Sequence, residues 1–227
     1  MRIDSVIFDF DGTVVDSEPN YYEADRLLMA KYGINFTFDM KKEFIGRGNT
    51  KMMEELNKRY NLPITVEEMT KEKNRLYLDI ALKGTPIYSE MLKFIKMLVR
   101  EGIPLALASG TSSSILNRLV YHLELQQYFD AVISSDDVGK SKPEPDIFLE
   151  AAKKIHTEPK NCLVVEDSAF GIEAGIRAGM QIMAVPYITD EPLDEIFFKS
   201  DMLFSRGQSE FSAEKAMAWF NTRYLQE

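Results

Sequence analysis

The 227-residue sequence contains one cysteine, Cys162, and only two histidines, His122 and His156. A single cysteine excludes an intramolecular disulfide and is typical of a reducing compartment. Cys162 begins an apolar segment, which favours a packing role over a redox role. The two histidines lack the spacing of a metal site. Thiolate and imidazole chemistry therefore receive no support from the sequence.

Positive charge is also scarce. The chain has 27 Lys and Arg against 36 Asp and Glu, and its formal net charge is −9. Nucleic acids and anionic membrane surfaces are bound by clustered basic residues, so neither is an expected partner. No apolar run approaches the roughly 20 residues of a membrane span, and Asp9 and Asp11 interrupt any signal-peptide core. We expect a cytoplasmic protein, with a monomer as the default state.

Strands and helices alternate over most of the chain. Residues 3–10 contain the continuous apolar run Val6-Ile7-Phe8, which is typical of a parallel strand covered on both faces. Beyond residue 89 the pattern predicts a series of further strands and helices. The strands are 103–108, 131–134, 162–165, 181–185 and 202–204, and the helices include 89–101, 145–155 and 168–178. This alternation predicts an α/β fold, a Rossmann-like parallel sheet flanked by helices.

The stretch between the first strand and the second is helical throughout. Thr65-Val66-Glu67-Glu68 forms a capping box before a helix that runs to about Leu82. Gly84, Pro86 and a predicted N-cap at Ser89 follow. The sequence therefore predicts a core domain made of residues 1–15 and 83–227. An all-helical domain, residues 16–82, is inserted into it.

Polar side chains gather where the predicted strands end. In an open parallel sheet, ligands bind beyond the carboxyl ends of the strands. The residues at those positions are carboxylates, a hydroxyl, a glycine and a lysine: Asp9, Asp11, Ser109, Gly110, Lys142, Glu166 and Asp167. We expect these residues to lie together at one edge of the sheet.

This set of groups has a chemical logic. Clustered carboxylate oxygens suit Mg²⁺, which shares its coordination sphere with phosphate. A serine hydroxyl, backbone amides at a helix N-terminus and a lysine can hold phosphate oxygens. One carboxylate can attack phosphorus, and a second can shuttle a proton. Two carboxylates about 5 Å apart repel by ~3 kcal/mol at an effective dielectric of 20, so the site calls for a counter-ion unless some carboxylates are protonated or further apart.

Four segments carry these residues: Asp9-Phe10-Asp11-Gly12-Thr13-Val14, Leu-Ala-Ser-Gly-Thr around Ser109, Lys-Pro-Glu-Pro-Asp from Lys142, and Val-Val-Glu-Asp-Ser around Glu166-Asp167. In order and spacing they resemble the motifs of the haloacid-dehalogenase-like hydrolase superfamily. The resemblance implies that Asp9 is the nucleophile and a metal ligand. It implies that Asp11 is the general acid/base and gives its backbone carbonyl to the metal.

The same resemblance assigns the remaining core residues. Ser109 and Lys142 bind the transferring phosphoryl group, and Lys142 is preferred over Lys140 because it precedes Pro143. Gly110 is a further phosphate-binding candidate on its position alone, because the amides of Gly110 and Thr111 lie at a predicted helix N-terminus. Asp167 is a metal ligand. For Glu166, two roles remain open: it ligates the metal directly, or it holds a metal-bound water. Thr13 would support the loop.

The helical insert corresponds to the type 1 cap of this superfamily, which selects the substrate. Tyr21, Arg47, Asn49 and Lys73 are the candidate substrate contacts in it. For Arg47, a solvent-exposed position without a substrate contact is an equally good interpretation. Lys73 lies in a stretch similar to the one where sugar-phosphate mutases of the family place a substrate lysine.

Three functions are compatible with the motifs. The leading one is a Mg²⁺-dependent phosphatase acting on a small phosphorylated metabolite, with a sugar phosphate as the candidate substrate. The second is a sugar phosphomutase similar to β-phosphoglucomutase, which this sequence departs from by having Tyr21 and Asn49 where those enzymes carry a histidine and an arginine. The third is a catalytically silent binding module of the same fold. Asp11 argues against dehalogenase chemistry, since that branch lacks the second aspartate.

Overall fold

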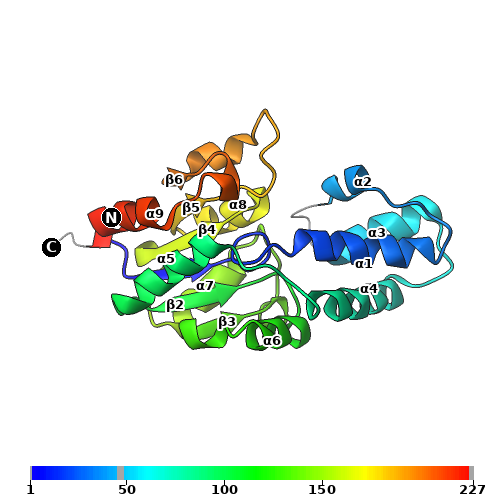
Figure 1. Cartoon of the computed structure of the whole chain (residues 1–227), viewed down its shortest axis with the longest axis horizontal. Coiled ribbons are helices and arrows are strands. Elements are labelled where there is room, and N and C mark those ends of the chain that lie inside the picture. Colours follow the sequence, from blue (N-terminus) through cyan, green and yellow to red (C-terminus); the bar gives the residue numbers. More distant parts are fainter. Residues whose placement is uncertain (1, 45–48, 225–227) are drawn as a thin grey trace. The chain divides into compact units, whose positions relative to one another are not determined.

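The computed structural model describes residues 2–44 and 49–224, and for Asn49 and Thr50 it describes the backbone alone. Contacts divide the chain into two compact units. The first, here called the α/β unit, contains the residues up to Asp16 and those from Ile87 onward, and the second, the helical unit, is Ser17–Pro86. Figure 1 shows the sheet of the α/β unit and the helices of each unit.

The α/β unit contains a six-stranded sheet with the order β3-β2-β1-β4-β5-β6. All its pairings are parallel. The strands are β1 Ser5–Phe8, β2 Leu105–Ala108, β3 Ala131–Ile133, β4 Cys162–Glu166, β5 Gln181–Ala184 and β6 Met202–Leu203. The predicted fold class is confirmed. β1 lies in the middle of the sheet, between β2 and β4, so the strand order reverses there and a ligand site is expected at its carboxyl end.

Helices cover both faces of this sheet. They are α5 Ser89–Arg100, α6 Ser113–His122, α7 Asp146–Lys154, α8 Ala169–Arg177 and α9 Ala213–Tyr224. Ile7 belongs to a buried cluster with Phe148 of α7 and Ile172 of α8. The next residue, Phe8, packs edge to face on Phe94 of α5, with ring centroids 6.0 Å apart. Neighbouring strand residues point to opposite faces, which is why the run Val6-Ile7-Phe8 is apolar without a break.

The two helix starts predicted from capping residues have different outcomes. The capping box at Thr65 is confirmed: its side chain accepts from the Glu68 amide, and the Glu68 side chain accepts from the Thr65 amide. The N-cap predicted at Ser89 is wrong. The amide of Tyr88 donates to the Val14 carbonyl at 3.1 Å, Tyr88 stays extended, and Ser89 is the first helical residue.

The helical unit contains α1 Glu18–Ala30, α2 Phe38–Lys42, α3 Asn49–Tyr60 and α4 Val66–Ala81. Its apolar core is built from aliphatic, aromatic and methionine side chains of these helices and the intervening loops. Residues 84 and 85 are linked to α1 of this unit, since the Asn20 amide donates to the Gly84 carbonyl and the Thr85 hydroxyl. The Thr85 hydroxyl in turn donates to the Ala81 carbonyl. No helix in the described ranges has both the length and the apolar character of a membrane span.

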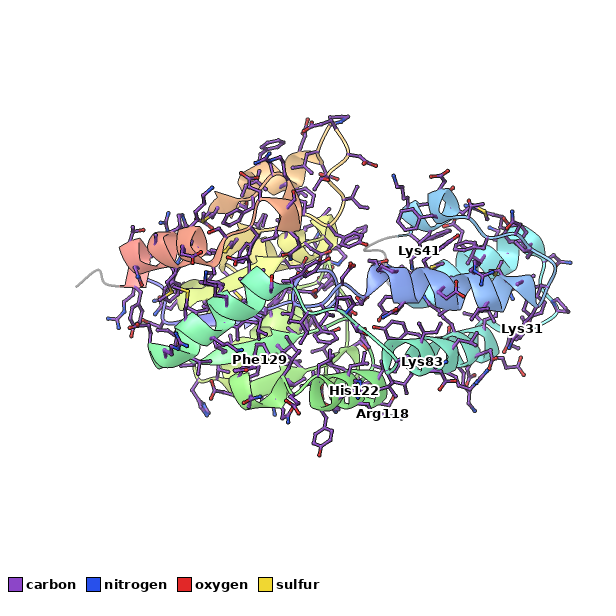
Figure 2. The ribbon with its side chains drawn as sticks, viewed as in Figure 1. Lys31, Lys41, Lys83, Arg118, His122 and Phe129 are labelled. Atoms are coloured by element: carbon purple, nitrogen blue, oxygen red, sulfur yellow. The ribbon has the colours of Figure 1, made fainter. Side chains whose placement is uncertain are left out.

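A buried carboxylate joins three helices of this unit. Asp25 of α1 is fully buried and lies 3.0 Å from the ammonium groups of both Lys41 on α2 and Lys73 on α4. Glu18 adds a second carboxylate, 3.8 Å from Lys41. Figure 2 shows Lys41 among the side chains of the helical unit. Two cations and two carboxylates therefore balance one another inside the unit.

Asp25→Asn should destabilise the helical unit by about 3 kcal/mol, because removing one partner leaves buried charge uncompensated. Amide hydrogen exchange of α1 and α4 measures this effect. Asp79→Asn is the matched control, since Asp79 pairs with Arg75 on the same unit but keeps 59% of its side chain exposed. The control should leave exchange unchanged. Equal protection in the two variants would contradict a structural role for Asp25.

Candidate active site

The ends of β1, β2 and β4 place the predicted site residues at one edge of the sheet. The Asp9 amide donates to the Val165 carbonyl at 3.0 Å, which extends the pairing of β1 with β4 by one residue. On the other side, the Ser109 amide donates to the Ile133 carbonyl at 2.9 Å and fixes the residue that follows β2. Neighbouring parallel strands thus bring together segments that are distant in the sequence.

Three buried carboxylates meet at this edge. Oxygen atoms of Asp9, Glu166 and Asp167 all lie within 4.8 Å of one another. The Lys142 ammonium contacts Asp9 and lies 2.7 Å from Glu166 Oε1. When the three carboxylates are ionised, Lys142 supplies one positive charge beside their three negative charges. The donor set therefore fits a divalent cation with a preference for oxygen ligands.

Burial and charge shift the ionisation of the central pair. Burial raises the pKa of the Asp9 carboxyl well above its ordinary value; Lys142 opposes this shift, while Glu166 and Asp11 add to it. Burial alone would lower the pKa of Lys142, but the Asp9 and Glu166 carboxylates beside it raise that pKa above its ordinary value. Lys142 is therefore a permanent cation at this site. A divalent cation beside Asp9 would favour its carboxylate form.

The two neighbouring acids of the last motif have different surroundings. Glu166 Oε1 contacts Lys142, and its Oε2 accepts from the Ser168 amide at 2.7 Å and from the Ser168 hydroxyl at 3.0 Å. Both Glu166 oxygens thus have partners. Asp167 Oδ1 lies 3.4 Å from the Thr13 hydroxyl. Glu166 is thus held by a cation, an amide and a hydroxyl, and Asp167 contacts the first loop through Thr13.

Two glycines make room for these carboxylates. A Cβ at Gly12, which has a φ of +81°, would overlap the Asp167 carboxylate. A Cβ at Gly171, in the first turn of α8, would overlap the Glu166 carboxylate. Gly171 was not predicted as a site residue, because a glycine near the start of a helix gives no signal of a carboxylate packed against it.

Asp11 is held by the loop that follows β2. Its Oδ2 accepts from the Ser109 hydroxyl at 2.9 Å and from the Thr111 hydroxyl at 2.8 Å. Ser109 is fully buried, and its Oγ also accepts from the Thr111 amide at 3.0 Å. Gly110, between them, is exposed, with open space where a Cβ would stand. The Thr111 hydroxyl is a contact that the motif did not reveal.

The candidate substrate contacts of the helical unit have different surroundings. Lys73 is 2% exposed and paired with Asp25, and burial lowers its pKa to about 8 although Asp25 opposes the shift. The Tyr21 ring stacks on Tyr77, with centroids 3.8 Å apart. Arg47 lies outside the described residues. Asn49 begins α3, and its side chain is not described.

The fold and this edge define a class: a Rossmann-like α/β protein with an inserted helical unit and a buried acidic centre beside a lysine. Residues 6–185 match the family model described as haloacid dehalogenase-like hydrolase. The chain belongs to this family of hydrolases, and the family membership expected from the four motifs is confirmed.

Two similar proteins carry a phosphatase activity in their names. A phosphorylated carbohydrates phosphatase of Thermotoga maritima is 33% identical over 183 residues, which cover 79% of this chain and 83% of the relative. A bifunctional riboflavin kinase/FMN phosphatase of Arabidopsis thaliana is 34% identical over 185 residues, 80% of this chain. The match spans only 48% of that relative, about half its length.

Among solved structures, the β-phosphoglucomutase of Clostridium difficile has the same fold. The alignment of the two chains has a TM-score of 0.81 and a sequence identity of 24%, and it covers 99% of this chain and 100% of that chain. At this identity the likeness establishes the architecture alone.

Gly171→Ala should weaken the binding of Mn²⁺, used as the probe cation, by about tenfold or more, because displacing a group that orients metal ligands has effects of this size. Isothermal titration calorimetry measures the change. Gly139→Ala is the control, since nothing lies within 4 Å of its added Cβ. Equal Mn²⁺ affinity in the two variants would show that the position of Glu166 does not matter to the cation.

Proposed function

We propose that the protein is a Mg²⁺-dependent phosphatase that hydrolyses a small phosphorylated metabolite, a sugar phosphate, through an aspartyl-phosphate. One observation carries the proposal: Asp9, Glu166 and Asp167 meet beside Lys142, with Asp11 two residues from Asp9 at the same edge. Family membership and the phosphatase relatives support it.

The cation would be held by the carboxylates of Asp9 and Asp167 and, as in the family, by the Asp11 backbone carbonyl. When bound, it would supply positive charge next to the phosphoryl oxygens and keep the nucleophile ionised. Glu166 would act on the site through Lys142 and the Ser168 turn, which its two oxygens already contact.

Asp9 is the proposed nucleophile. Its carboxylate oxygen attacks phosphorus, the bond from phosphorus to the substrate oxygen breaks, and Asp11 donates a proton to the departing alkoxide. Asp11 then removes a proton from water as that water attacks phosphorus. The bond to Asp9 breaks, inorganic phosphate is released, and both aspartates return to their starting states.

Lys142, Ser109 and Gly110 would hold the transferring group. Lys142 supplies a fixed positive charge in a buried position, where electrostatic stabilisation of a phosphoryl group is strongest. Ser109 offers its hydroxyl, and exposed Gly110 offers backbone without a side chain over it.

Substrate choice is assigned to the helical unit, with Tyr21, Arg47, Asn49 and Lys73 as candidate contacts. Lys73 is the weakest of these, because Asp25 already binds its ammonium inside the unit. The Thermotoga maritima relative supports a phosphorylated carbohydrate as substrate.

A sugar phosphomutase would share Asp9, Asp11 and Lys142 with a phosphatase. Such mutases carry a histidine and an arginine at the positions where this chain has Tyr21 and Asn49. This difference favours water, rather than a sugar hydroxyl, as the acceptor of the phosphoryl group.

We further propose a monomeric cytoplasmic enzyme with no nucleic-acid or membrane partner.

Asp9→Asn should abolish phosphate release, because an amide cannot attack phosphorus. The assay uses glucose 6-phosphate, fructose 1-phosphate, ribose 5-phosphate, glycerol 3-phosphate and phosphoglycolate, each with Mg²⁺ and with EDTA. Asp79→Asn, at an exposed position of the helical unit, is the control and should match the parent. Release that survives in Asp9→Asn or in EDTA would contradict the mechanism. No release from any ester by the parent would move the assignment to the mutase or the silent module.

Asp11→Asn should lower kcat for the best of these esters by about 100-fold to 10⁴-fold, the usual contribution of a positioned acid/base. KM should change much less, because Asp11 acts on the proton and not on substrate affinity. Steady-state kinetics separates the two parameters. A variant with the kcat of the parent would remove Asp11 from the mechanism.

A further inference from the structure

The loop that follows β2 carries a side chain to which the four motifs give no role. Thr111 is 9% exposed, and its hydroxyl donates to Asp11 Oδ2 at 2.8 Å. Its backbone is fixed on both sides: the amide donates to Ser109 Oγ, and the carbonyl accepts from the Ser135 amide at 3.2 Å. A threonine anchored in this way presents its hydroxyl in one position.

The hydrogen-bonding capacity of Ser109 makes this hydroxyl important. A serine hydroxyl has a single O–H to donate, and in the structure Ser109 directs it to Asp11 Oδ2. If Ser109 donates to a phosphoryl oxygen, as proposed above, it releases Asp11. The Thr111 hydroxyl then remains as the donor that holds Asp11 Oδ2.

The second oxygen of Asp11 has different surroundings. Oδ1 is buried and has no hydrogen-bond partner among the residues that the structure describes. With donors directed at Oδ2, the carboxyl is fixed in rotation, and Oδ1 is the oxygen that can give or take a proton. The Thr111 contact therefore determines which oxygen is presented to the reacting atoms.

We propose that Thr111 is a positioning residue, which orients the Asp11 carboxyl for proton transfer to the leaving alkoxide. This inference rests on the proposed function, because it takes Asp11 as the acid/base. Thr111 itself is not a catalytic residue in this scheme, since it acts through Asp11.

The test compares two leaving groups. For the sugar phosphate released fastest in the panel, the leaving alkoxide needs a proton from Asp11, whereas the nitrophenolate of p-nitrophenyl phosphate leaves without one. Because kcat/KM reports only the steps through departure of the leaving group, it isolates this proton transfer. Thr111→Val, which keeps the shape and removes the hydroxyl, should lower kcat/KM about tenfold to 100-fold for the sugar phosphate and less than about threefold for p-nitrophenyl phosphate.

Two further variants separate positioning from structural damage. Thr111→Ser keeps the hydroxyl and should retain the activity of the parent on both esters. Thr157→Val removes a hydroxyl that donates to the Ile155 carbonyl, at 3.3 Å, and should change neither value. Equal losses on both esters in Thr111→Val, or no loss on either, would overturn the inference while leaving the phosphatase intact. If the parent hydrolyses neither ester, the proposed function itself fails, and the inference fails with it.

Discussion

The contact of the Lys142 ammonium with Asp9 and Glu166 is the interaction on which the rest of the site depends. Three carboxylates converge on a buried point, and each pair about 5 Å apart would repel by ~3 kcal/mol at an effective dielectric of 20. Lys142 offsets part of this repulsion and remains charged, because both carboxylates raise its pKa. The sheet can therefore tolerate the cluster, and the carboxylate oxygens are the donors that the candidate site offers to a ligand.

This electrostatic arrangement constrains the backbone around it. Glu166 reaches Lys142 only because Gly171 leaves space at the start of α8, and Asp167 occupies the space that Gly12 leaves in the first loop. The Ser168 amide and hydroxyl then fix the second oxygen of Glu166. Glu166 is thus oriented by the space at Gly171 and by hydrogen bonds from Ser168, and Asp167 by the space at Gly12 and by its contact with Thr13.

The sequence predicted the parts of the molecule that depend on local pattern. The apolar run Val6-Ile7-Phe8 indicated a doubly covered strand, and the rule for strand ends placed Asp9 and Glu166 at one edge. What it could not provide depends on contacts between distant segments. Thr111 and Asp11 are 100 residues apart, and a threonine after a serine and a glycine has the same appearance whether its hydroxyl faces solvent or a carboxylate.

Two buried lysine–carboxylate clusters in this chain differ in composition. In the helical unit, Lys41 and Lys73 contact Asp25, and Lys41 also lies near Glu18, so two lysines stand beside two carboxylates. These ion pairs join the helices of the unit to one another. At the sheet edge, Lys142 contacts Asp9 and Glu166, and the oxygen atoms of these two acids and of Asp167 lie within 4.8 Å of one another. Three clustered carboxylates beside one lysine are a donor set that suits a divalent cation. This composition, rather than burial, distinguishes the candidate site from the cluster of the helical unit.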